Sequence, residues 1–125
     1  MIDHMASWDD VVRIGLALPE VVVDDWYGTP ALKVRTKGFA RMWSDREHSR
    51  DGVDRATPVL VVMCDVEEKD ALMASHHALF ETPHYKGHGA MLIRLDQVDD
   101  DDLAGFLEDA WCQKAPKTLI EQLET

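Results

Sequence analysis

Residues 31–43, with the sequence ALKVRTKGFARMW, form the clearest structural unit of the chain. Apolar Leu32 and Val34 alternate with basic Lys33 and Arg35, a turn sequence follows at 36–38, and a second run extends from Phe39 to Trp43. Alternation with a period of two is typical of a strand with one buried face. We therefore predict a β-hairpin at this point of the chain.

Local patterns on both sides of the hairpin predict the remaining elements. Apolar residues three and four positions apart indicate helices over residues 8–18, in a segment beginning at 99–102 and in a short one after Pro116. A capping box at Asp65 and Glu68 indicates a further helix over 66–75. Apolar or β-branched runs indicate strands, over residues 21–27, 59–64, 79–81 and 90–95. Residues 44–57 lack apolar periodicity and are expected to be a solvated loop, and residues 82–89 are expected to be a loop because they contain one proline and two glycines.

The order of these elements predicts the fold class. Hairpins connect the early strands and a single helix separates the later ones, which favours a mostly antiparallel sheet over a doubly wound parallel one. The apolar run 59–64 is the best candidate for a central strand. We predict an α+β two-layer fold with helices packed on one face of the sheet. It is expected to be a single domain over residues 7–123, preceded by an N-terminal extension over 1–6.

The charge of the chain is high but unevenly distributed. The 125 residues include 24 acidic and 13 basic side chains, a formal net charge of −11, with 46% hydrophobic residues. This apolar content excludes extensive disorder, and the two cysteines exclude a disulfide scaffold. The acidity argues against a surface that attracts phosphate backbones everywhere. However, residues 31–58 hold seven bases and four acids, so any anion site is expected there.

Several features bear on cell compartment and partners. No apolar stretch approaches the roughly 18 residues that a membrane-spanning helix needs, and the first residues lack the pattern of a secretory signal. Cys64 and Cys112 are expected to be reduced, packed thiols. We therefore expect a cytoplasmic protein that does not bind membranes and is a monomer.

The bases of the hairpin are the first candidate site. Lys33, Arg35, Lys37 and Arg41 occupy odd positions, so in a regular strand they would tend toward one face. Such a face could bind anions. Alternatively, an exposed hairpin carries lysine and arginine for solubility and to protect a sheet edge.

Aromatic residues in two loops are the second candidate. Trp26 and Tyr27 precede a tight turn, and Tyr85 lies between His84 and Lys86 in a loop rich in glycine. Rings and bases together could form a platform on which a base or another planar ligand stacks. Alternatively, the rings of the first pair fill the core and hold the turn.

Metal binding and catalysis are not expected. His84 and His88 have the spacing of two ligands on one helix face, but Pro83 and Gly87 make a helix unfavourable there. The four aspartates at 99–102 fall where a helix begins, and negative charge is favourable at that end. The chain contains no nucleophile motif, dinucleotide fingerprint or P-loop. We expect neither a metal nor a cofactor, and we expect the protein not to be an enzyme.

Several short motifs in the same order resemble those of the MmcQ/YjbR family of small bacterial proteins. They lie at residues 26–34, 64–65, 82–87, 92–95, 110–111 and 115–117, so the resemblance extends over about 7–123. It implies a frataxin-like (CyaY-like) α+β fold and a double-wing arrangement associated with DNA binding. It implies no catalytic residues. The chain departs from the family pattern in a longer segment at 44–57 and in Gly89-Ala90.

Two hypotheses follow for the function. The resemblance implies a non-enzymatic nucleic-acid-binding protein in which the hairpin bases contact phosphates. The alternative is a small-molecule or protein-binding module that recognises an anionic or planar partner. Its site would combine rings and bases from the two loops with two strand residues, namely Trp26, Tyr27, Lys33, His84, Tyr85, Lys86 and Arg94.

Overall fold

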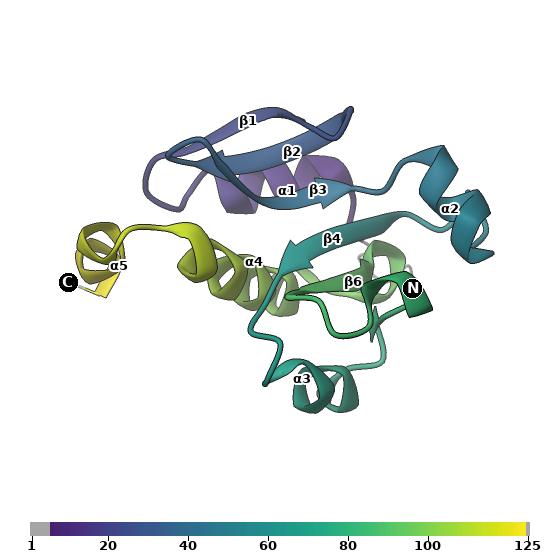
Figure 1. The fold of residues 1–125 in the computed structure, drawn as a ribbon. Coiled ribbons are helices and arrows are strands. Elements are labelled where there is room, and N and C mark those ends of the chain that lie inside the picture. The colour runs from purple at the N-terminus through teal and green to yellow at the C-terminus, as the bar shows by residue number, and fades with distance from the viewer. Residues whose placement is uncertain (1–5, 125) are drawn as a thin grey trace.

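The computed structural model describes residues 6–124 and has an α+β fold (Figure 1). The helices among these residues are α1 (Trp8–Gly15), α2 (Asp45–Asp51), α3 (Lys69–Ser75), α4 (Asp100–Lys114) and α5 (Lys117–Glu124), with short 3-10 turns η1 (Pro83–Tyr85) and η2 (Leu95–Gln97). The strands are β1 (Val21–Trp26), β2 (Thr29–Val34), β3 (Lys37–Met42), β4 (Val59–Met63), β5 (Leu79–Phe80) and β6 (Ala90–Arg94). Of the extension expected at residues 1–6, positions 1–5 lie outside the described residues.

The strands form one open antiparallel sheet in the order β1-β2-β3-β4-β6-β5. The predicted antiparallel α+β class is therefore confirmed, and the apolar run 59–64 lies within the sheet as β4. Figure 1 shows α1 and α4 together beneath the sheet. None of the helices described is long and apolar enough to cross a membrane.

The main core lies between the sheet and α1, α4 and α5. Leu60 and Ile93 from the sheet are fully buried there, together with Leu107 and Trp111 from α4 and Leu119 from α5. The indole N–H of Trp111 donates a hydrogen bond of 3.1 Å to the carbonyl of Pro19, which fixes α4 against the end of the first connection. The apolar stripe predicted along this helix thus forms the centre of the core.

The opposite face of the sheet carries a smaller apolar cluster. Val59, Val61 and Leu92 point to this face and pack with Trp43 and Tyr85. We call it the open face, because α1, α4 and α5 pack on the other side. Its polar portion, beside this cluster, holds the candidate site.

The prediction of a loop over 44–57 is wrong for residues 45–51, which form α2. Ser44 begins the helix with a capping box, in which its hydroxyl accepts a hydrogen bond from the Glu47 amide and the Glu47 carboxylate accepts one from the Ser44 amide. Gly52 ends it with φ at +70°. Capping and ion pairs hold this helix, and an apolar stripe does not, so periodicity failed to indicate it.

A β-bulge separates the hairpin bases. Leu32 pairs with Ala40 and Lys33 with Gly38, so Phe39 is an additional residue on β3. Alternation along β3 is therefore reversed at this point. Lys37 pairs with Val34, whose side chain lies in the helix-covered core, whereas Arg41 is on the open face. The expectation that all four bases tend toward one face is wrong for this reason.

Candidate functional site

A pocket of about 670 Å³ lies on the open face. The pairing of β3 with β4 ends at Ala40 and Val62, although β4 continues to Met63. The pocket occupies this region. Its walls come from the β1–β2 turn, β3, α2, the ends of β4 and β6, the loop after η1, and the last residue of α4.

The β1–β2 turn forms one side of the pocket. Tyr27 and Gly28 have φ of +55° and +75°, as in the two-residue hairpin turn that matches strand twist. The rings of Trp26 and Tyr27 are 5.5 Å apart, and Tyr27 is 77% exposed. The Trp26 ring lies over Gly38, where an added Cβ would come within 2.4 Å of it. A glycine is therefore required at residue 38 for the indole to lie flat on β3.

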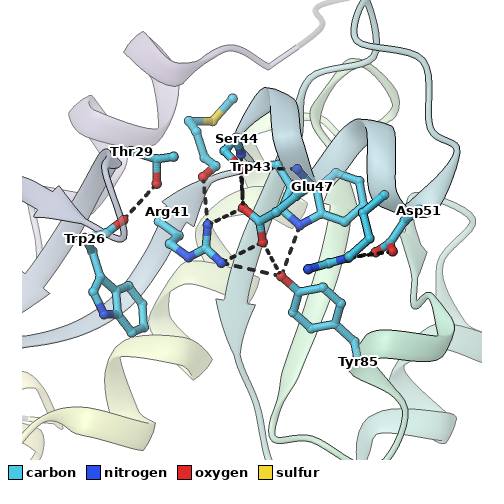
Figure 2. A network of polar contacts seen from close by, with 10 residues as sticks. Trp26, Thr29, Arg41, Trp43, Ser44, Glu47, Asp51 and Tyr85 are labelled. Carbon is cyan, nitrogen blue, oxygen red and sulfur yellow. Dashed lines mark hydrogen bonds and ion pairs between the residues drawn. The ribbon is translucent and has the colours of Figure 1, made fainter.

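A buried polar cluster forms the back of the pocket (Figure 2). The Arg41 guanidinium donates two hydrogen bonds, of 2.7 and 2.9 Å, to the Glu47 carboxylate. The Tyr85 hydroxyl donates one of 2.8 Å to Glu47 and accepts one of 3.0 Å from the indole N–H of Trp43. We call these four residues the Arg41 network. It connects β3, α2 and the η1 loop.

Arg41 and Glu47 are both ionised in the Arg41 network, so their opposite charges cancel. Burial disfavours the ionised form of Glu47, but the hydrogen bonds from Arg41, Ser44 and Tyr85 together outweigh burial and lower its pKa to about 2. Burial likewise opposes the charge on Arg41, and the bonds to Glu47 outweigh it and raise the arginine pKa. The Arg41 charge is thus matched by Glu47, and its guanidinium carbon lies 5.1 Å from the centre of the Tyr27 ring.

Lys69 holds the η1 loop through hydrogen bonds to its backbone. Its side chain is 3% exposed, and its ammonium donates hydrogen bonds of 2.6 and 3.2 Å to the carbonyls of Tyr85 and His88. Glu81 lies 2.7 Å from the same ammonium and balances its charge. This buried ion pair, reached from α3, fixes the backbone of the loop on which His84, Tyr85 and His88 face the pocket.

A second contact ties the same loop to α2. The Thr82 hydroxyl donates a hydrogen bond of 2.6 Å to Asp51, and Arg50 donates two more to that carboxylate. The bonds from Arg50, assisted by that from Thr82, lower the pKa of Asp51 to about 2. The guanidinium carbon of Arg50 lies 6.0 Å from the centre of the Tyr85 ring, so Arg50 borders the pocket while its charge is shared with Asp51.

The pocket concentrates positive charge in an acidic protein. Four of its lining residues are cations and one is a carboxylate, so the lining carries +3 within a chain of net charge −11; these residues are Arg41, Arg46, Glu47, Arg50 and Lys114. Arg46 and Lys114 form no ion pair with any residue between 6 and 124. The imidazoles of His84 and His88 stack 6.1 Å apart on the same lining.

The structure brings together half of the predicted site residues. The lining includes five of them, namely Trp26, Tyr27, Arg41, His84 and Tyr85. Lys33 instead lies 3.2 Å from Asp24, and Arg35 donates two hydrogen bonds to Glu20.

The other three predicted residues also lie outside the lining. Lys37 and Lys86 are exposed. Arg94 stacks on Phe80, with its guanidinium carbon 3.9 Å from the ring centre.

Several other lining residues were not predicted from the sequence. Arg46, Glu47 and Arg50 belong to the helix that was expected to be a loop, and the Ser44-x-x-Glu47 spacing was the available signal for it. Lys114 lies 68 residues after Arg46 in the sequence, and no local pattern connects them. His88 was considered only as a metal ligand.

Comparison with known proteins places the chain in a family of α+β domains. The YjbR family model matches residues 16–113, and the chain belongs to this family. The resemblance identified from the motifs is thereby confirmed. Among its relatives are the uncharacterized proteins Rv2570 of Mycobacterium tuberculosis (strain ATCC 25618 / H37Rv) and Mb2600 of Mycobacterium bovis (strain ATCC BAA-935 / AF2122/97). Each is 34% identical over 128 residues, covering 94% of this chain and 95% of the relative.

A solved structure supports the same assignment at the level of fold. The crystal structure of Deinococcus radiodurans protein DR2400, a DUF419 domain, superposes with a TM-score of 0.64 at 18% identity. The similarity covers 87% of this chain and 78% of the other. At this identity the likeness shows a shared fold and carries no information about the ligand.

Proposed function

We propose that this protein is a binding module for a small anionic molecule, which it takes up in the pocket on the open face. The observation that carries the proposal is the charge of the lining, +3 in a chain of −11. Of the four lining cations, Arg46 and Lys114 have no carboxylate partner among residues 6–124, so their charges are available to a ligand. A volume of about 670 Å³ lies within the usual range for small-molecule sites.

Nucleic-acid binding by the hairpin has weaker support. Its affinity would come from bases that neutralise phosphates. Lys33 and Arg35 are paired with Asp24 and Glu20, and Arg41 is buried against Glu47. Outside the pocket lining the chain carries −14, which would repel a duplex that extended beyond it.

The proposal includes a non-enzymatic role. The hydroxyls of Ser44 and Tyr85 at the pocket are both engaged with Glu47, and Glu47 is engaged with Arg41, which supports binding over catalysis. We also propose a frataxin-like topology, a monomeric state and a cytoplasmic location. The open antiparallel sheet with α1 and α4 on one face supports the first of these.

Thermal shift and calorimetry with inorganic phosphate, pyrophosphate and citrate test this function. We expect at least one probe to raise the melting temperature, with an affinity that falls as salt is added. Reversing two unpaired pocket charges, Arg46→Glu with Lys114→Glu, should weaken binding by at least about tenfold, roughly 1.4 kcal/mol.

The matched control reverses the same residue types at the hairpin tip, Arg35→Glu with Lys37→Glu. It should change the affinity by less than about twofold, because neither residue lines the pocket and salt screens exposed charges. The proposed function is wrong if no probe binds at millimolar concentration. It is also wrong if the hairpin variant loses as much affinity as the pocket variant.

A further inference from the structure

We propose that the ligand belongs to the mononucleotide class, a flat heterocycle joined to a phosphate, and that its ring stacks on Tyr27 while its phosphate binds Arg46 and Lys114. The inference rests on the proposed function, since it assigns a ligand class to the same pocket. It goes further because the ligand must carry a flat ring as well as a negatively charged group. Three observations on the β1–β2 turn and the lining support it.

The first observation is the backbone conformation of Tyr27. Its φ of +55° lies in the left-handed region, where a bulky residue is unfavourable and where asparagine or glycine is preferred in a two-residue hairpin turn. Arg35 has the same conformation in the β2–β3 turn, but its side chain is held by two hydrogen bonds to Glu20. The Tyr27 side chain makes no such hydrogen bond to any residue between 6 and 124, and 77% of the residue is exposed.

The second observation is the position of this ring. Tyr27 stands at the edge of the pocket, with Trp26 tilted against it at 5.5 Å and the Arg41 guanidinium 5.1 Å from its centre. Both contacts hold the ring in place and leave most of its surface to solvent. An exposed aromatic ring that is fixed before the ligand arrives is a suitable stacking surface, because little side-chain entropy is lost on binding.

The third observation is the match between the ring and the charges. Arg46 and Lys114 line the same pocket as Tyr27, and His84 and His88 add ring nitrogens that can donate hydrogen bonds. A phosphate monoester is close to a dianion near neutral pH, so a lining of +3 suits it better than a single carboxylate. The volume of about 670 Å³ accommodates a ring, a sugar and a phosphate.

The acidic surroundings favour a free nucleotide over a nucleic-acid strand. Asp24 and Asp25 precede Trp26 on β1, and Asp45 begins α2 on the other side of the pocket; all three are exposed. A strand that continued past the pocket would bring its next phosphates toward these carboxylates. A mononucleotide ends within the pocket and avoids this repulsion.

Calorimetry on the full chain tests the ligand class. The probes are the 5′-monophosphates of adenosine, guanosine, cytidine and uridine together with flavin mononucleotide. Each is compared with its phosphate-free counterpart and with inorganic phosphate. We expect at least one monophosphate to bind at least about tenfold more tightly than both of its comparison compounds.

Substitutions at residue 27 test the stacking surface. Tyr27→Asn suits the backbone conformation, so it should leave the melting temperature unchanged or higher while weakening the best monophosphate by at least about tenfold. Tyr27→Phe keeps the ring and should change the affinity by less than about threefold. Inorganic phosphate should bind wild type and Tyr27→Asn equally.

Four outcomes would overturn this inference, and they also separate it from the proposed function. If inorganic phosphate binds as tightly as every monophosphate, or Tyr27→Asn binds the best one normally, the ring is not recognised while the anion site remains. If neither the monophosphates nor the simple anions bind, both proposals fail. If a single-stranded oligonucleotide binds more tightly than every monophosphate, the ligand is a nucleic acid.

Discussion

The guanidinium of Arg41 and the carboxylate of Glu47 meet in two hydrogen bonds of 2.7 and 2.9 Å, with both side chains at most 12% exposed. This pair joins a central strand to α2, whose N-terminus is capped by the same Glu47. The position of α2 in turn places Arg46 and Arg50 at the pocket. The stability of this pair therefore determines whether the proposed anion site exists.

Neutralising the buried carboxylate should destabilise the fold. Glu47→Gln leaves the Arg41 charge buried without its partner, and we expect the free energy of unfolding to fall by about 3 kcal/mol. Urea denaturation measures the change. The matched control is Glu20→Gln, which removes the carboxylate from the exposed pair with Arg35 and should lower stability clearly less, because solvent screens that pair. Equal losses in the two variants would contradict the structure.

The same pair predicts a specific response to acid. The pKa of Glu47 is about 2 in the folded protein against an ordinary 4.5, so the unfolded chain takes up the proton first as the pH falls. The stabilisation is complete above pH 4.5 and is lost between 4.5 and 2, with a total on the order of 3 kcal/mol. The stability difference between wild type and Glu47→Gln should shrink across this range.

Urea unfolding of both proteins at pH 6, 4.5 and 3 checks this expectation. Asp51 also has a pKa of about 2, but it is present in both proteins and cancels from the difference. A difference that stays constant down to pH 3 would be expected only if Glu47 does not face Arg41 in solution.

Removing one hydroxyl should weaken the Arg41 network without breaking its ion pair. In Tyr85→Phe the indole N–H of Trp43 loses its acceptor and Glu47 loses a donor. We expect the free energy of unfolding to fall by about 1–2 kcal/mol, measured by denaturation. Tyr27→Phe removes an exposed hydroxyl and should change it by less than about 0.5 kcal/mol. If Tyr85→Phe leaves the free energy of unfolding unchanged, the hydroxyl binds water in solution and the two hydrogen bonds are contradicted.

We expect an added methyl group to have opposite effects on stability at two glycines. At Gly38 a Cβ would come within 2.4 Å of the rigid Trp26 indole, so Gly38→Ala should displace that ring and lower stability by roughly 1–3 kcal/mol. At Gly105 in α4 a Cβ would meet no atom within 4 Å, and alanine favours the helix. Gly105→Ala should leave stability unchanged or raise it by up to about 1 kcal/mol. Trp fluorescence and urea denaturation distinguish the two, and the reverse order would contradict the packing described.

Much of the fold could be predicted from the sequence because its core elements have strong local signals. The apolar run that became β4, the alternation in β2 and the stripe of α4 each identify an element without reference to the rest of the chain. Helix α2 had no such stripe. Its capping box from Ser44 to Glu47 was visible, but its stability also depends on the ion pair of Glu47 with Arg41 on the preceding strand, which no local pattern indicates.

The candidate site was harder to predict because it is assembled from distant segments. The rings of Trp26, Tyr27 and Tyr85 were found because aromatic residues in short loops stand out locally. The prediction that the hairpin bases share one face was wrong, because the bulge at Phe39 reverses the side-chain alternation along β3. Pairing with carboxylates, which occupies Lys33 and Arg35, also cannot be derived from spacing alone.

The most direct measurement of the pocket's role is an NMR titration of the ¹⁵N-labelled protein with pyrophosphate, followed by amide and arginine Nε–H shifts. The structure predicts saturable shifts concentrated at Arg46, His84, His88 and Lys114, with little change at residues 33–37. Shifts concentrated at 33–37 would locate anion binding on the hairpin instead. An absence of saturable shifts at millimolar pyrophosphate would contradict the pocket as an anion site.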